Sequence, residues 1–207
     1  VVPEPSSKKS SPRSSAPASL KTVYRDSRFW RLAPLSATCV GSAWALQGLW
    51  AAPWLADVEG LDRPSLITRL FVMAVALSFG ALLLGTIADQ MRRRGVGLHG
   101  LLAAVAALFI AAQLTLILQL PLPSYFSWSV VAAVGAGTVI SYAIVADYFP
   151  KELAGRANAA LNVFHLGWAF VFQCPTALML AKWQSQAGHY PLPPYQVPFC
   201  PNAPLPI

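Results

Sequence analysis

Residues 95–146 read GVGLHGLLAAVAALFIAAQLTLILQLPLPSYFSWSVVAAVGAGTVISYAIVA, a run of 52 residues without Asp, Glu, Lys or Arg. The hydrocarbon core of a bilayer is about 30 Å thick, and roughly 20 residues of α-helix cross it. The run is long enough for two such helices. Pro121 and Pro123 near its middle supply the turn, because proline interrupts a helix. We therefore predict two membrane spans, at about 99–119 and 126–147.

Three further intervals without charge are each long enough for one span. They cover residues 32–56, 70–88 and 157–181. They predict spans at about 35–55, 67–88 and 158–181. The alternative is a set of buried helices in a water-soluble protein, but soluble helices are seldom apolar on every face. The sequence therefore predicts an all-α integral membrane fold with five transmembrane helices.

The composition agrees with a membrane environment. Of the 207 residues, 56% are hydrophobic and 11% are charged, whereas a typical soluble domain has about 25% charged residues. The mean hydropathy of +0.51 is also high. Few charges remain to cover a water-facing surface. This argues against a soluble enzyme, a disordered chain and a nucleic-acid-binding protein.

Lys and Arg residues are divided unevenly between the two sides of the predicted membrane domain. Twelve of the 15 precede the first span or follow the second and fourth, and the other side holds only Arg63, Arg69 and Lys182. Basic loops face the cytoplasm. We therefore expect a multi-pass protein of the cell (inner or plasma) membrane with a cytoplasmic N-terminus. The net charge of +7 then reports topology, and no nucleic-acid partner is expected.

The two ends of the chain differ from the predicted membrane domain, residues 35–183. Residues 1–34 are basic and rich in Ser and Pro, which predicts a cytoplasmic linker. Residues 184–207 hold seven prolines and no charge, which predicts an external tail that does not form a sixth helix. An odd number of spans behind such a linker favours a piece of a larger protein.

Polar side chains form stripes along the first, fourth and fifth predicted spans. On the fifth span they lie within an arc of about 80° at 100° per residue. Lipid cannot form hydrogen bonds with such a stripe, so the stripe faces water or protein. It either borders a water-filled cavity or only holds neighbouring helices together. The third span has no stripe, so Leu108 and Leu116 are expected to face lipid. The stripes contribute six mid-depth residues that we expect to border one water-filled cavity: Gln47, Trp50, Thr138, Tyr142, Asn162 and His165.

His165 is the one ionisable side chain deep within a predicted span. It either binds an anion or carries a coupled proton, or it serves as a neutral hydrogen-bonding partner in a packed bundle. The sequence contains no phosphate-binding loop of the GxxxxGK[ST] type. It also contains no CxxC pair and no convincing Ser/His/Asp arrangement. We therefore expect no catalytic residue, no metal and no cofactor.

Residues 85–94, at the end of the second predicted span, read GTIADQMRRR. This stretch resembles the cytoplasmic loop signature of the major facilitator superfamily, G-x-x-x-D-[RK]-x-G-[RK]-[RK]. Gln90 and Arg92 depart from the signature. Residues 147–158 are similar to the loop that enters the fifth helix of each half in that family. The resemblance covers roughly residues 20–183, and the residues that match the signature are Gly85, Asp89, Arg93 and Arg94.

The resemblance implies a transporter of twelve helices in two halves, so the five spans would form part of a six-helix bundle. The basic segment before the first span looks like the linker between the halves. This places the spans as helices seven to eleven, with helices one to five as the alternative, and makes the missing N-terminal half a partner. Gly85, Asp89, Arg93 and Arg94 are implied to form a conformational latch on a helix N-terminus. The alternative is a solvated Asp89 paired with neighbouring arginines.

The sequence therefore predicts secondary active transport of a small polar solute or an organic anion across the lipid bilayer, by alternating access. Small residues at helix crossings let helices slide, and Gly80, Gly85, Gly135 and Gly137 are expected to act in this way. Two alternatives stay open. One is a membrane sensor or scaffold without transport. The other is an integral-membrane transferase, which would need clustered His or acidic residues at one membrane face.

Reporter fusions test this topology. Fusions after Gly97 and Leu153 should report a cytoplasmic location, and fusions after Gly60 and Ser124 an external one, because the Lys and Arg asymmetry sets the orientation. The measurement is the activity of a compartment-specific reporter at each site. One reversed location among the four would contradict the five-span topology.

Overall fold

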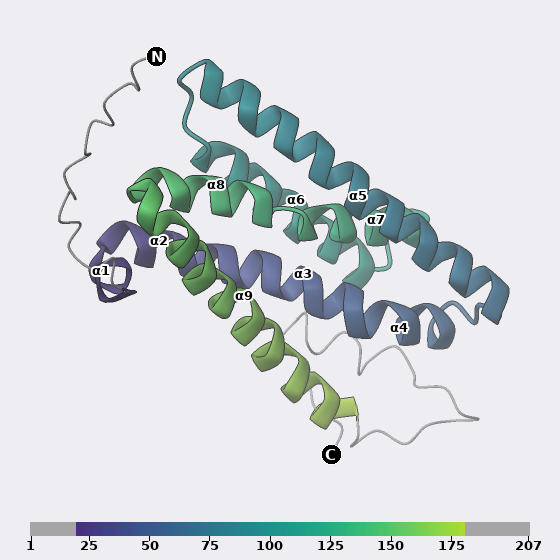
Figure 1. The fold of residues 1–207 in the computed structure, drawn as a ribbon. Helices are drawn as coiled ribbons and strands as arrows, with labels where there is room; N and C mark the ends of the chain where they lie inside the picture. The colour runs from purple at the N-terminus through teal and green to yellow at the C-terminus, as the bar shows by residue number, and fades with distance from the viewer. Residues whose placement is uncertain (1–19, 181–207) are drawn as a thin grey trace, which may run out of the picture.

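The computed structural model describes residues 20–180, and all regular structure in this range is helical. A short helix, α1 (Leu20–Arg25), is followed by five long helical segments that lie against one another (Figure 1). Each of the five predicted spans falls on one of these segments as far as the described residues reach. The chain therefore has the all-α architecture that its sequence predicts.

The first long segment, which we call the 27–57 helix, departs from α-helical winding at two places. It consists of α2 (Ser27–Ser36), a π-helical turn (Ala37–Gly41), α3 (Ser42–Ala45), a second π-helical turn (Leu46–Trp50) and α4 (Ala51–Asp57). Pro53 has no N–H to donate to the carbonyl of Leu49, and its ring would collide with that carbonyl in a regular helix. The wide turn before Pro53 accommodates the ring.

The 27–57 helix begins before the predicted span at 35. Asp26 has extended backbone, and its carboxylate accepts a hydrogen bond from the Arg28 backbone N–H at 2.8 Å. This is an N-cap, which satisfies a donor that the helix itself leaves free. Residues 20–25 and 27–34, which the sequence assigns to the linker, are therefore helical.

The remaining segments follow the predicted order. They are α5 (Arg63–Arg93), α6 (His99–Ile117), α7 (Ser124–Gly135) with α8 (Thr138–Tyr148), and α9 (Lys151–Leu180). Pro64 occupies the first turn of α5, where a missing N–H costs nothing. The turn between α6 and α7 contains Pro121 and Pro123, as expected.

The fourth predicted span is interrupted between α7 and α8. The backbone N–H groups of Ala136 and Gly137 donate to the carbonyls of Ala133 and Val134, three residues back, at 3.1 and 2.7 Å. Such i to i−3 bonds tighten the winding for one turn. The span predicted as one continuous helix is therefore two shorter helices joined by a tight turn.

Three helical segments are long and apolar enough to cross a membrane: Arg63–Arg93, His99–Ile117 and Ser124–Tyr148. They confirm the predicted membrane class of the chain. The other two predicted spans, 35–55 and 158–181, stay predictions, and residue 181 lies outside the described residues.

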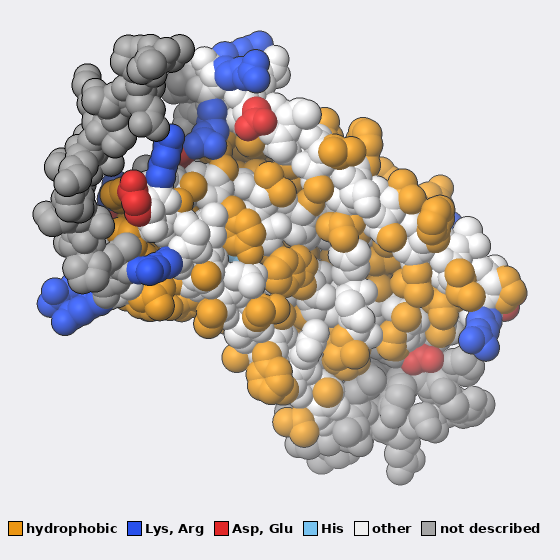
Figure 2. Space-filling view, viewed as in Figure 1, with side chains coloured by type: hydrophobic (Ala, Val, Ile, Leu, Met, Phe, Trp, Pro, Cys, Tyr) orange, Lys and Arg blue, Asp and Glu red, His pale blue; other side chains and the backbone are white. Residues whose placement is uncertain are grey.

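The surface supports the same assignment. Charged side chains gather towards the two ends of the helices, and the broad middle of the visible face is uncharged and largely apolar (Figure 2). Large apolar side chains of α5 are exposed, including Phe71, Phe79 and Leu82 at 67%, 64% and 71%. We call the end at which α5 finishes the basic end, because it carries Arg25, Arg28, Arg31, Arg92, Arg93, Arg94, Lys151 and Arg156.

Helix α6 buries one face against α7. Its buried residues recur every three or four positions, which is the spacing of one helix face. Leu116 belongs to this face and is 6% exposed, whereas Leu108 is 52% exposed. The expectation that both leucines face lipid is therefore wrong for Leu116. Because this helix has no polar stripe, its sequence does not show which side packs against other helices.

Two glycines let helices cross in backbone contact. A Cβ atom at Gly80 of α5 would lie 2.9 Å from Cα of Ala133 in α7, and one at Gly41 would lie 2.6 Å from the backbone oxygen of His165 in α9. Small residues at crossings allow this approach. The expectation is confirmed at Gly80. At Gly85 the nearest atom would be 3.9 Å away, so Gly85 makes no close crossing within the described residues.

We expect Gly41→Ala to destabilise the protein, because the new methyl group would collide with the α9 backbone. Overpacking of this kind costs about 1–3 kcal/mol. Gly48→Ala is the matched control on the same helix, since a Cβ at Gly48 would meet no atom within 4 Å. The measurement is thermal unfolding of the purified full-length protein. Equal melting temperatures for the two variants would show that this crossing is not tight.

Candidate functional site

A network of hydrogen-bonded polar side chains lies between the helices. His165 of α9 is fully buried, and its Nε2 is 2.7 Å from Oγ of Ser36 in the 27–57 helix. Ser36 donates its hydroxyl hydrogen to Oγ of Ser141 in α8 at 2.7 Å, and Ser141 donates to the carbonyl of Gly137 at 3.2 Å. Ser36 has a single O–H. Nε2 is therefore the donor towards Ser36, which leaves Nδ1 of the neutral ring as an acceptor.

Aromatic and amide side chains surround this imidazole. The ring centroids of Trp44 and Tyr142 lie 5.8 and 5.9 Å from that of His165. The Tyr142 hydroxyl donates to Oδ1 of Asn162 at 2.8 Å. We call these six side chains the His165 cluster: Ser36, Trp44, Ser141, Tyr142, Asn162 and His165. It combines a titratable ring, two aromatic walls and several hydrogen-bonding groups.

The cluster contains three of the six residues that the sequence nominates for a cavity. Tyr142, Asn162 and His165 lie together, as the contacts above show. Gln47 lies beside the cluster, because a Cβ built on Gly135 would sit 3.5 Å from its Oε1 and 3.4 Å from Trp44. The indole N–H of Trp44 also donates to the carbonyl of Gly135 at 3.2 Å.

The two remaining nominated residues lie elsewhere in the contact network. Trp50 is buried in the hydrophobic core, and its indole N–H finds no partner within residues 20–180. Thr138 is partly buried at the start of α8. The described contacts do not join either residue to His165. A solute-binding role for the six nominated residues therefore stays a prediction.

The serines and Trp44 are members of the polar stripes that the sequence did not single out. Ser36 is the second residue of the first predicted span, and the sequence therefore places it near the membrane surface. The observed helix starts at Ser27, so Ser36 lies more than two turns inside it. The cap at Asp26 is the signal that could have located it deeper.

His165 Nδ1 is buried and finds no partner within the described part of the chain. This nitrogen can take a proton or receive a hydrogen bond. Such a group in a water-poor interior is energetically costly. Costly polar groups in membrane helices mark solute or proton pathways.

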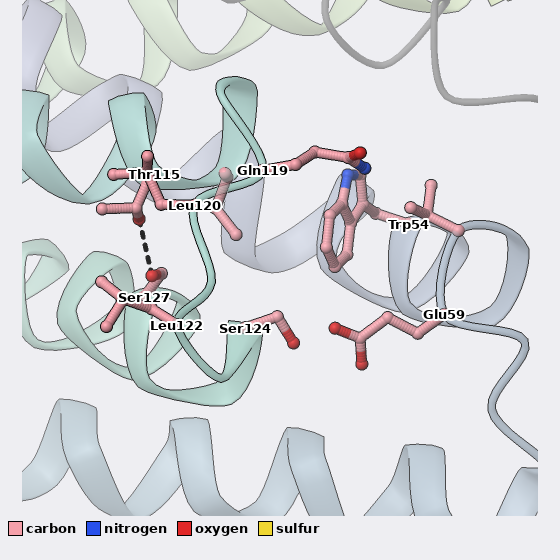
Figure 3. A pocket seen from close by; sticks show the side chains of 10 residues that line it. Trp54, Glu59, Thr115, Gln119, Leu120, Leu122, Ser124 and Ser127 are labelled. Carbon is pink, nitrogen blue, oxygen red and sulfur yellow. Dashed lines mark hydrogen bonds between the residues drawn. The ribbon is translucent and has the colours of Figure 1, made fainter.

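A small cavity of about 200 Å³ lies at the end opposite the basic end. Figure 3 shows Glu59 directed towards Ser124, the Trp54 indole beside Gln119, and a hydrogen bond of 2.6 Å between Thr115 and Ser127. Gln119 has a φ of 46°, in the left-handed region that residues other than glycine seldom adopt. The tight turn between α6 and α7 thus directs polar groups into this cavity.

The predicted latch residues lie at the basic end. Asp89, Arg93 and Arg94 are exposed, and Gly85 is partly buried. Asp89 makes no hydrogen bond or ion pair with any residue in the range 20–180. Arg92 pairs with Asp147 at the end of α8 instead. The sequence missed this pair, although both residues flank loops that it places on one side of the membrane. The latch itself stays a prediction.

Metal-binding chemistry finds no support in the described range. Among residues 20–180, no three or more His, Cys, Asp and Glu side chains are grouped so as to hold a metal ion. The two described cysteines, Cys39 and Cys174, are both free thiols.

Comparison with known families assigns the chain to a class. The family model described as Major Facilitator Superfamily matches residues 1–172 of the 207. No curated protein and no solved structure matches the chain. The chain belongs to the major facilitator superfamily, a family of membrane transporters and not of enzymes. The resemblance drawn from residues 85–94 and 147–158 is thereby confirmed.

We expect Asp89→Asn to slow solute transport at least about fivefold, because a charge that biases one of two conformations typically shifts their balance by this factor or more. Glu152→Gln is the matched control, since Glu152 is an exposed acid at the same end of the molecule. The measurement is the initial rate of uptake by the full-length protein, normalised to its abundance in the membrane. Equal rates for both variants would reduce Asp89 to a solvated loop acid.

Proposed function

We propose that the protein carries out secondary active transport of a small polar solute or an organic anion by alternating access. The observation that carries this proposal is the His165 cluster, which sits among apolar helices where unpaired polar groups are costly. Family membership supports transport in general, and the cluster supports a hydrogen-bonding cargo. A site near the middle of the helices is where transporters of this architecture bind their solutes.

The cluster offers a defined set of contacts to such a cargo. Tyr142 and Trp44 would form rigid walls, and Asn162 and Gln47 would orient the cargo through hydrogen bonds. His165 would act through Nδ1. A neutral ring accepts a hydrogen bond there, and a protonated ring donates one and attracts an anion. Protonation of His165 would thus couple solute binding to a proton.

Alternating access requires this cluster to open, because His165 is fully buried in the present conformation. The 27–57 helix is well suited to that movement. Its two π-helical turns are sites where the regular hydrogen-bond ladder is already widened. We propose that this helix moves away from α9 and exposes Asn162 and His165 to water.

The orientation and partners follow the same proposal. The basic end would face the cytoplasm of a cell (inner or plasma) membrane, and residues 1–19 would continue there as a linker. The five helices would be helices seven to eleven of the transporter, and the latch residues Gly85, Asp89, Arg93 and Arg94 would contact the N-terminal half. The exposed apolar side of α5 would face that half or lipid.

Cysteine labelling with flux in the same vesicles tests this function. We expect Asn162→Cys and His165→Cys to react with a water-soluble thiol reagent in the full-length protein on a background without Cys39 and Cys174. Asn162→Cys should react faster, because Asn162 is only partly buried. Solutes that the wild-type protein transports, from a panel of small polar solutes and organic anions, should slow the reaction.

Leu108→Cys is the lipid-facing control and should stay unreactive. Val105→Cys is the core-buried control, because Val105 is 6% exposed and belongs to the buried face of α6. Equal labelling at all four positions would refute the cavity. Labelling at none of them, together with no flux for any solute, would leave the cluster as a helix-joining element and would contradict transport.

A further inference from the structure

A cavity of about 400 Å³ opens at the basic end, between the 27–57 helix, α6 and α8. Its rim is polar and its base is apolar. The rim consists of Arg28, Arg31, His99 and Tyr148, and the base consists of Leu32, Leu35 and Leu102. None of the six residues nominated for solute binding lines it. The cavity therefore suits a ligand that is polar at one end and apolar at the other.

The rim carries a net positive charge. The carboxylate of Asp26 accepts hydrogen bonds from Nε and Nη2 of Arg28, at 3.1 and 2.7 Å, and this contact lowers the pKa of Asp26. Asp26 thus stays ionised and neutralises Arg28. Arg31 is exposed and makes no hydrogen bond or ion pair within residues 20–180, so it supplies the uncompensated charge.

Tyr148 completes the rim with a polar edge. Its hydroxyl lies 2.6 Å from Nε2 of His99, and Arg28 stacks over its ring at 5.2 Å while donating to its carbonyl at 2.9 Å. Three helices therefore hold the rim in place through direct contacts. A ligand would meet a preformed set of donors and one free guanidinium.

The apolar base continues into a second cavity deeper along the same helices. Leu35 lines both, and the second cavity has a volume of about 270 Å³. It runs between the 27–57 helix, from Leu35 to Ser42, and the face of α6 that carries Ala106, Phe109, Ile110 and Gln113, and Phe172 of α9 also lines it. Seven helical residues span about 10 Å. Leu35 and Ile110 are 46% and 56% exposed, so this groove is open on the outer side of the bundle.

We propose that this groove binds an anionic phospholipid, with its phosphate against Arg31 and one acyl chain along Leu35 and Ile110. Basic pockets between membrane helices on the cytoplasmic side are suited to anionic head groups, and this placement rests on the orientation proposed above. Charge argues against the chain's own ends as occupants. Residues 1–19 carry more basic than acidic residues, and residues 183–207 carry no charge.

Lipid binding to the full-length protein tests this site without measuring transport. We expect dioleoylphosphatidylglycerol to raise the melting temperature of the delipidated protein and to be retained in native mass spectrometry, and the corresponding phosphatidylcholine to do neither. Arg31→Gln should weaken phosphatidylglycerol binding about fivefold, the effect of one basic residue near a membrane surface. Arg156→Gln, an exposed arginine of α9 at the same end, should leave it unchanged.

Two further arms separate a lipid from other occupants. Leu35→Trp should weaken binding, because it narrows the junction of the two cavities, whereas Leu108→Trp on the exposed side of α6 should not. Glycerol 3-phosphate, which has the head-group phosphate but no acyl chain, should not stabilise the protein. The proposal would be overturned if both lipids had equal effects, or if glycerol 3-phosphate without an acyl chain stabilised the protein. It would also be overturned if the Arg31→Gln variant bound phosphatidylglycerol as well as the wild type. If phosphatidylglycerol bound as expected but the protein transported no solute, the proposed function would be wrong and the lipid site would still be supported.

Discussion

The absence of water in hydrocarbon is the constraint on which this structure depends. Each backbone N–H and C=O group within the bilayer needs a partner in the protein, and the α-helix supplies one locally. Departures from regular winding therefore stand out. The π-helical turns of the 27–57 helix and the tight turn at Ala136 and Gly137 rearrange backbone hydrogen bonds without abandoning them. The same constraint explains why polar side chains such as His165 and Ser36 bind one another.

The course of the chain through five helices could be read from charge, because charged residues are nearly absent from the predicted spans and occur there only at the ends, as Arg69 and Asp147. Helix boundaries could not. The 27–57 helix starts where Asp26 caps it, and this depends on a single side chain. The break between α7 and α8 falls at Gly135, Ala136 and Gly137, within a run that has no charge or proline to mark a boundary. Leu116 was misplaced because an apolar helix shows no sequence difference between its packed side and its lipid side.

The candidate site was predicted in part for the same reason. Helical periodicity groups residues of one helix correctly, so Asn162 and His165 were expected on one face. Periodicity carries no information about which residues of other helices meet that face. Trp44 of the 27–57 helix packs against the His165 ring, whereas Trp50 of the same predicted stripe lies in the hydrophobic core. The ion pair between Arg92 and Asp147 likewise depends on how the ends of α5 and α8 meet.

Helix contacts made only by packing and helix contacts made partly by hydrogen bonds differ in the free energy needed to separate them. Helices α5 and α7 meet through backbone and apolar atoms at Gly80 and Ala133, and water offers no replacement for such packing. The 27–57 helix and α9 also cross closely at Gly41, but they meet in addition through hydrogen bonds, from His165 to Ser36 and from Trp168 to Ser42 at 2.9 Å. Water can replace hydrogen bonds at little net cost. Motion between states should therefore occur where the 27–57 helix meets α9, while α5 and α7 move as one unit.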